Sequence, residues 1–307
     1  MKKSEIYSFK GLYRDDFKVT GYEFGEGNKT VCIVGSLRGN EYQQIYVCSR
    51  LIEKLKEIEE AGMIQKGKSI MVIPCANPYS VNIKKRFWSI DNTDINRMFP
   101  GYDLGETTQR IADGIFKVVK EYKYGIQFAS FYMPGHFIPQ VRMMKTGNEN
   151  VDLARKFGLP YIVLHKPRPF DTTTLNYNWQ IWDTEAFSIY TSSTEKIDKK
   201  SANLGVNAVL NFLEREGVIE YKSVPFFPSK VVESDKFITI RSSNAGFLDS
   251  IAKVGAEVHK GQIIAYITDP YTAQVLQTVK ADHDGVIAFA YDSPLAYKNT
   301  ALFKIIP

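Results

Sequence analysis

The chain has 307 residues, of which 44% are hydrophobic and 24% charged, and its formal net charge is +5. This composition is ordinary for a globular protein with two domains of about 100–200 residues each. No stretch approaches the roughly 20 apolar residues that cross a bilayer, and the basic residues are dispersed, so we expect neither membrane nor nucleic-acid partners.

The N-terminal segment and the cysteines point to a cytoplasmic protein. Residues 1–17 have no apolar core after their lysines, so we expect no signal peptide. Cys32, Cys48 and Cys75 are too few and too scattered for a disulfide framework, and none lies in a CxxC pair. We therefore expect buried, reduced thiols.

Short apolar runs alternate with helical periodicity over the first two thirds of the chain. Residues 31–36 and 69–75 are continuous runs rich in valine and isoleucine, as expected of buried strands. Between them, residues 41–61 have apolar side chains at helical spacing. This order predicts a right-handed crossover in an α/β sheet. Farther along, we predict helices over 107–122 and 202–215, and strands over 125–130, 160–165 and 187–192.

The pattern changes after a proline-bearing linker at 224–229. From Lys236 on, short β-rich runs alternate with turns. Residues 245–267 can be superposed on 284–305, which predicts two similar β-halves packed face to face. We therefore predict an α/β domain over 1–225, with a mixed sheet flanked by helices, and a small all-β domain over 230–307.

Residues 77–101, NPYSVNIKKRFWSIDNTDINRMFPG, contain the most specific pattern. An Asn-Pro follows a buried strand, Arg86 comes about ten residues later, and Asp-x-Asn-Arg-x-Phe-Pro-Gly ends the segment. This pattern resembles the zinc carboxypeptidase superfamily, and within it the succinylglutamate desuccinylase/aspartoacylase group. The segments GSLRGNE and ETTQRIADGIF, and the β-rich tail, also resemble that group, so the resemblance extends from about residue 18 to 305. It implies a carboxypeptidase-like domain followed by a barrel-sandwich-like β domain.

The resemblance also implies a mechanism. In that group a zinc ion is held by a His and a Glu of a Gly-x-His-Gly-x-Glu motif and by a second His at a strand end. The metal lowers the pKa of a bound water, and a glutamate near a later strand end acts as general base on an amide. Arginines and an asparagine bind the carboxylate of the substrate.

The residues of this chain depart from that pattern at the metal. Arg38 stands at the first histidine position, and a guanidinium has no lone pair to give. Glu41 is retained, but Gln127 stands at the aspartate of the strand motif and Ala129 at the second histidine. A catalytic zinc site needs about three protein ligands, so we expect no metal cofactor, with zinc as the alternative.

The general base and the remaining histidines leave alternatives open. Ser192 stands at the position of the catalytic glutamate, and Glu195, three residues later, is a further candidate for that role. His136 is a candidate metal ligand, and for it and for His165 the ordinary interpretation is a histidine that is hydrogen-bonded locally. We expect the other two histidines, in turns of the tail, at the surface.

The substrate-binding residues persist. Arg86, Asn96 and Arg97, together with Arg38, are predicted to bind a carboxylate. The alternative is that Asp94 and Asn96 only build the turn and that Arg97 pairs with Asp94 or Glu41. We further hypothesise that Arg38 lies near the lost metal position and pairs with Glu41; otherwise both side chains lie in solvent.

Three functions remain open at this stage. The first is a catalytically degenerate family member that binds a small carboxylate-bearing molecule, such as an N-acyl amino acid, without hydrolysing it. The second is an amide or ester hydrolase with a non-standard metal set, in which Glu41, His136 and Glu195 would act. The third is a structural or partner-binding protein whose pocket is a relic.

Overall fold

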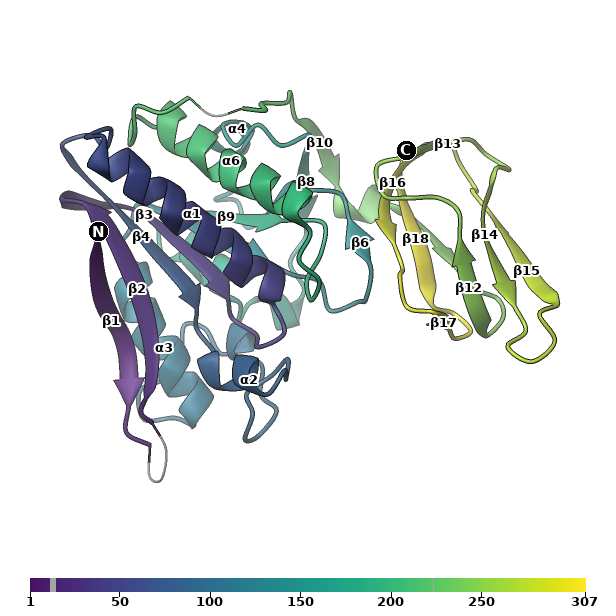
Figure 1. Ribbon diagram of the computed structural model, residues 1–307, viewed down its shortest axis with the longest axis horizontal. Helices are drawn as coiled ribbons and strands as arrows, with labels where there is room; N and C mark the ends of the chain where they lie inside the picture. Colours follow the sequence, from purple (N-terminus) through teal and green to yellow (C-terminus); the bar gives the residue numbers. More distant parts are fainter. Residues whose placement is uncertain (12–14, 223) are drawn as a thin grey trace. The chain divides into compact units, whose positions relative to one another are not determined.

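The computed structural model describes residues 1–11, 15–222 and 224–307 (Figure 1). The chain divides into two compact units. The first comprises Met1–Ser130 and Pro139–Val231, and the second comprises Phe131–Ile138 and Val232–Pro307. Among the described residues, no helix is both long enough and apolar enough to cross a membrane. Residues 12–14 of the N-terminal segment considered above, and Ser223, lie outside the described residues.

The first unit is built on a nine-stranded mixed sheet of order β1-β2-β4-β3-β5-β9-β7-β8-β10. Strands β4, β3, β5 and β9 run parallel, whereas β1 pairs with β2, β2 with β4, and β7 with β9 in the antiparallel sense. The strands are β1 (Lys2–Phe9), β2 (Phe17–Gly25), β3 (Gly27–Ser36), β4 (Gly67–Cys75), β5 (Tyr124–Ala129), β7 (Gln140–Met144), β8 (Tyr161–His165), β9 (Glu185–Tyr190) and β10 (Lys230–Glu233).

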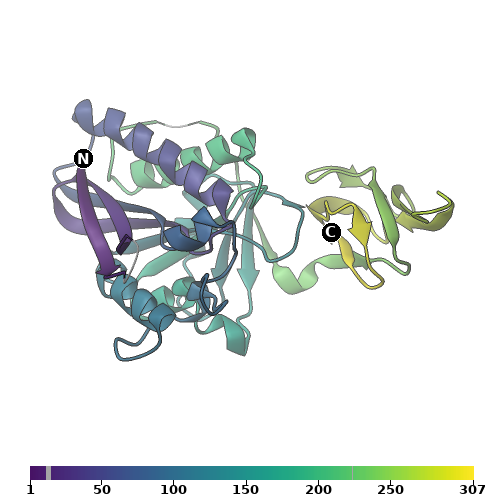
Figure 2. The same cartoon turned by 60° about the horizontal axis from the view of Figure 1, so that its bottom comes forward.

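Helices cover both faces of this sheet (Figures 1 and 2). Helices α1 and α6 lie side by side over one face and share a core with β3, β4 and β5, while α3 and α5 contribute to the core on the other face. The α-helices are α1 (Tyr42–Glu60), α2 (Pro78–Asn82), α3 (Thr107–Val119), α4 (Val151–Arg155), α5 (Leu175–Ile181) and α6 (Lys199–Arg215). The 3₁₀ helices are η1 (Ile95–Arg97), η2 (Pro169–Asp171) and η3 (Ser234–Lys236).

The predicted α/β architecture is confirmed. The runs at 31–36 and 69–75 lie within β3 and β4, which are parallel neighbours, and α1 connects them. Helix α3 ends at Val119, before the predicted 122, because β5 already begins at Tyr124. Strand β9 ends at Tyr190 rather than 192, and the chain that follows forms a loop instead.

The second unit consists of antiparallel strands in two sheets, of order β11-β18-β16-β13, with β6 also paired to β16, and β15-β14-β12-β17. The strands are β6 (His136–Phe137), β11 (Ile238–Arg241), β12 (Gly246–Ser250), β13 (Glu257–Val258), β14 (Ile263–Thr268), β15 (Val275–Lys280), β16 (Gly285–Ala290), β17 (Leu295–Ala296) and β18 (Ala301–Ile306).

The internal repeat of this unit is present in the structure. Gly246 begins β12, which pairs with β14, and Gly285 begins β16, which pairs with β18. The two pairs occupy equivalent positions in the two halves of the repeat. At Gly246, a Cβ atom would lie 2.3 Å from the carbonyl oxygen of Thr268. At Gly285, a Cβ atom would lie 2.2 Å from the carbonyl oxygen of Ile306, so neither position has room for a side chain. The two halves exchange short strands, since β12 pairs with β17 and β16 with β13.

One segment from within the predicted first domain belongs to the second unit. Phe131–Ile138 directly follows Ser130, and its strand β6 pairs with β16. The ring of Phe137 stacks on that of Phe131, with centroids 3.5 Å apart, and lies 4.6 Å from that of Phe289. The boundary placed at 225–230 from the sequence stays a prediction.

Candidate functional site

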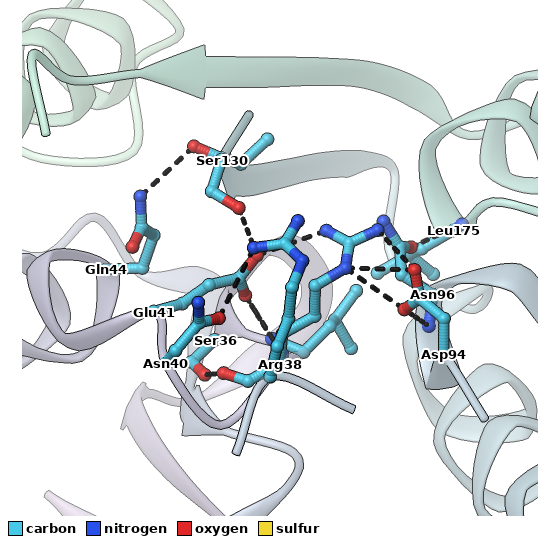
Figure 3. A network of polar contacts seen from close by, with 12 residues as sticks. Ser36, Arg38, Asn40, Glu41, Gln44, Asp94, Asn96, Ser130 and Leu175 are labelled. Carbon is cyan, nitrogen blue, oxygen red and sulfur yellow. Dashed lines mark hydrogen bonds and ion pairs between the residues drawn. The ribbon is translucent and has the colours of Figure 1, made fainter. Parts of the chain in front are cut away.

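The candidate site lies where β3, β5 and β9 end. Carboxyl ends of neighbouring parallel strands meet at one edge of a sheet, so the loops after these strands converge there. The polar side chains at this edge form two hydrogen-bonded groups, in part drawn in Figure 3, that we together call the Arg38 cluster. Its members are Arg38, Asn40, Glu41, Arg86, Asp94, Ser130 and Glu195.

Glu41 is the most buried member, with a relative exposure of 1%. Its Oε2 accepts hydrogen bonds from the backbone N–H groups of Leu37 (2.9 Å) and Arg38 (3.0 Å). Its Oε1 accepts from Arg38 Nη1 at 3.1 Å and from the Ser130 hydroxyl. An ionised carboxylate has about four acceptor positions, so these four donors saturate it.

Arg38 lies between two carboxylates (Figure 3) and is 6% exposed. Its Nε is 3.0 Å from both carboxylate oxygens of Asp94, and its Nη2 donates to Asp94 Oδ2 at 2.8 Å. Burial by itself would lower the pKa of Arg38, but the charges of Glu41 and Asp94 outweigh it and raise that pKa above its ordinary value. The hypothesised pairing of Arg38 with Glu41 is therefore present, and its alternative, with both side chains in solvent, is wrong.

Arg86 is partly buried and differs from Arg38 in its partners. Its Nη1 donates to Asn40 Oδ1 at 3.3 Å, and Asn40 Nδ2 donates to Glu195 Oε1 at 2.6 Å. Within the described ranges, no carboxylate lies at ion-pair distance from Arg86. Burial, and then repulsion from Arg38, lower the pKa of Arg86, and the more distant charges of Glu41, Asp94 and Glu195 oppose that shift.

Arg97 pairs with Asp171, and not with Asp94 or Glu41. Its Nη1 is 3.2 Å from Asp171 Oδ1, and Asp171 Oδ2 is 3.1 Å from His165 Nε2. The alternative in which Arg97 pairs with Asp94 or Glu41 is therefore wrong, because both of those carboxylates pair with Arg38. Asp94 does build the turn, since its Oδ1 accepts from the Asn96 N–H at 3.0 Å.

The remaining predicted residues are placed as follows. Asn96 accepts a hydrogen bond from the Leu175 N–H at 3.2 Å and so connects the turn to the start of α5. Ser192 is partly exposed in the loop after β9. His136 lies in the second unit, where its Nε2 is 3.4 Å from Asp292 Oδ2. Gln127 and Ala129 are buried on β5.

The residues at the implied metal position do not fit a zinc ion. Arg38 offers no lone pair, Ala129 offers no donor atom, and the lone pairs of Glu41 are taken by four donors. Across residues 1–11, 15–222 and 224–307, no group of three or more His, Cys, Asp or Glu side chains is arranged to hold a metal. What the cluster offers instead is a set of charge-assisted hydrogen bonds.

Comparison with known proteins identifies the family. A sequence model of the succinylglutamate desuccinylase/aspartoacylase catalytic domain matches residues 27–214. The chain belongs to the succinylglutamate desuccinylase/aspartoacylase family. The predicted resemblance is thereby confirmed.

Relatives of this family member match it over most of its length. An N-alpha-acetyl-L-2,4-diaminobutyric acid deacetylase of Halomonas elongata is 26% identical over 290 residues, which cover 88% of this chain and 79% of that protein. The crystal structure of a succinylglutamate desuccinylase/aspartoacylase from Rhodobacter sphaeroides has a TM-score of 0.80 at 18% identity and covers 99% of this chain and 95% of its own. A succinylglutamate desuccinylase from Silicibacter sp. has a TM-score of 0.81 at 18% identity, with 99% and 93% covered. At these identities, the two structures support the fold alone.

Sequence reasoning missed three residues of the site. Asn40 stands between Arg38 and Glu41 in the first motif, and its place in that motif was the available signal. Ser130 directly follows Ala129 and lies within reach of Glu41. Asp171 gave no signal, since it lies 74 residues from Arg97 in the sequence.

Proposed function

We propose that this chain binds a small carboxylate-bearing molecule of the N-acyl amino acid type at Arg86 and does not hydrolyse it. The observation that carries the proposal is the contrast between two arginines. Arg38 is paired with both Glu41 and Asp94, whereas Arg86, another member of the cluster, is partly buried without a carboxylate of its own.

The charge of Arg86 favours an anion. A guanidinium that has lost part of its hydration and has gained no ion pair binds a carboxylate more strongly than one in water. Its planar fork suits two parallel hydrogen bonds to the two carboxylate oxygens. Arg38 is already paired with Glu41 and Asp94, so Arg86 is the cation of the cluster that a ligand carboxylate would pair with.

The absence of hydrolysis is proposed from the residues that would have to activate water. The lone pairs of Glu41 face four donors, so it is not poised to accept a proton from water or to hold a metal. The ligand class is proposed from the Halomonas elongata relative, whose name gives an N-acetylated amino acid as its substrate.

The test compares N-acetyl-L-amino acids with their primary carboxamides, which have the same shape but no carboxylate. We expect the acids to raise the melting temperature and the amides to leave it unchanged; at one hundred times Kd the gain in unfolding free energy is about 2.7 kcal/mol. Arg86→Met should abolish the shift, whereas Arg50→Met, which removes an exposed arginine of α1, should preserve it.

Two results would contradict the proposal. The binding half fails if no acid stabilises the wild-type chain, or if Arg86→Met responds as the wild type does. The non-hydrolytic half fails if the wild type, supplied with zinc, releases acetate from these acids and Glu41→Gln does not.

A further inference from the structure

The side chain of Asn40 lies between a cation and an anion. Its Oδ1 accepts from Arg86 Nη1 at 3.3 Å, and its Nδ2 donates to Glu195 Oε1 at 2.6 Å. Asn40 is 8% exposed, and only this orientation of the amide satisfies both neighbours, because a guanidinium cannot accept a hydrogen bond and an ionised carboxylate cannot donate one. The two charges thus face each other across a single amide group.

These two charges lack ion-pair partners in the described part of the chain. The nearby charges are paired with one another, since Arg38 pairs with both Glu41 and Asp94. Arg86 and Glu195, by contrast, take part in no ion pair among the residues described. Glu195 is exposed, and its charge is felt at Arg86, where it opposes the lowering of the pKa.

A ligand with a carboxylate alone would suit this arrangement poorly. Its carboxylate would neutralise Arg86 but would also approach Glu195, and two like charges at short range repel. A ligand that carries an ammonium group besides its carboxylate would satisfy both side chains.

We propose that Glu195 is a specificity-determining residue that binds a primary ammonium group, so that the preferred ligand is an N-acyl amino acid with a free amine on its side chain. This inference rests on the proposed binding function and narrows its ligand class to zwitterionic molecules. Glu195 acts here through charge and hydrogen bonding, not as a general base.

The experiment compares two ligands that differ only in the amine. N-alpha-acetyl-L-2,4-diaminobutyric acid carries it, and N-alpha-acetyl-L-2-aminobutyric acid does not. By titration calorimetry of the full chain at low salt, we expect the diamino acid to bind about two- to fivefold more tightly, the gain appropriate to one exposed ion pair.

Variants separate the two charges. Glu195→Gln keeps an oxygen for Asn40 Nδ2, so it should fold as the wild type does. It should lose the preference for the diamino acid, and it should bind the amine-free acid more tightly than the wild type does, because the repulsion from Glu195 is removed. Arg86→Met should weaken both ligands. Glu53→Gln, which removes an exposed carboxylate from α1, should change neither.

The outcomes are distinguishable. Equal binding of both ligands by the wild type, or a preference that persists in Glu195→Gln, overturns this inference and leaves the proposed function standing. If neither ligand binds the wild type, the proposed function fails and this inference fails with it.

Discussion

Glu41 is held inside the first unit by the number and kind of its donors. A buried charge is tolerated when it is paired and fully hydrogen-bonded, and Glu41 meets both conditions through Arg38, Ser130 and two backbone N–H groups. Arg38, in turn, uses Asp94 as a second partner. At this scale three charges form a chain, in which the guanidinium of Arg38 lies between the carboxylates of Glu41 and Asp94.

Replacing Glu41 with glutamine tests this dependence on charge. Glu41→Gln removes the anion and turns an N–H group toward N–H donors, so we expect a loss of about 3–5 kcal/mol in the free energy of unfolding. Urea denaturation measures it. Glu53→Gln breaks an exposed ion pair with Arg50 and should cost less than about 1 kcal/mol. Similar losses in the two variants would show that Glu41 is not stabilised by its pairing.

Zinc binding should be recoverable by two substitutions. In Arg38→His with Ala129→His, two imidazoles replace the guanidinium and the methyl group, and Glu41 Oε1 loses the donor at 3.1 Å. With three ligands available, zinc should raise the melting temperature of this variant by several degrees and a chelator should reverse the effect. The wild type should respond to neither. One tightly bound zinc per wild-type chain would contradict the whole interpretation of the site.

At the scale of elements, short turns position the arginines. Asp94 caps η1, which carries Arg97, and Asp171 ends η2 and accepts from the Arg168 N–H at 3.0 Å. The ion pair of Arg97 with Asp171 therefore joins two 3₁₀ turns that are distant in the sequence. Asn96 adds a second connection between the η1 turn and the helix that follows η2.

This connection should make stability depend on pH. Burial would raise the pKa of Asp171, but hydrogen bonds from His165, the Arg168 N–H and Arg97 lower it well below its usual range. In the unfolded chain an aspartate has a pKa of about 3.9, so the stabilisation is complete above about pH 5. It is lost as the pH falls, because the unfolded state takes up the proton first. We expect Asp171→Asn to cost about 2 kcal/mol at pH 7 and progressively less toward pH 2.5.

Urea denaturation across this pH range provides the measurement. Asp152→Asn is the matched control, since Asp152 is 98% exposed, and its effect should stay within about 0.5 kcal/mol at every pH. If the loss in the free energy of unfolding for Asp171→Asn did not change with pH, the charge of Asp171 would contribute nothing to stability.

Element-scale features were largely predictable, and contacts between distant residues were not. The periodicity of 41–61 located α1 to within a residue at each end, and the alternating runs located β3 and β4, because burial of one face dictates those patterns. The pairing of Arg38 with Glu41, three residues apart, also followed from local spacing. The partner of Arg97 did not, because a salt bridge over 74 residues leaves no trace in a single sequence.

At the scale of the whole molecule, the chain leaves the first unit at Ser130, which binds Glu41, and returns to it at Pro139. The segment between is held in the second unit by β6, and by the Ile138 N–H, which donates to the Ala288 oxygen at 2.9 Å. The residue that completes the hydrogen bonding of Glu41 is therefore continuous with a strand of the second unit.

Gly135 is the point of closest approach in this segment. It has a φ of +147°, and a Cβ atom there would lie 2.4 Å from the ring of Phe289 and 2.5 Å from the Ala290 oxygen. Gly255, also in the second unit, has a φ of +84° but open space around it. Gly255→Ala should therefore lower the free energy of unfolding by about 1–2 kcal/mol, through backbone strain alone. Gly135→Ala should lower the free energy of unfolding by about 2 kcal/mol more, because β6 must also move away from β16. If urea denaturation gave equal losses in the free energy of unfolding for the two variants, Phe131–Ile138 would move without an energetic penalty. The pairing of β6 with β16 would then not fix the chain that follows Ser130.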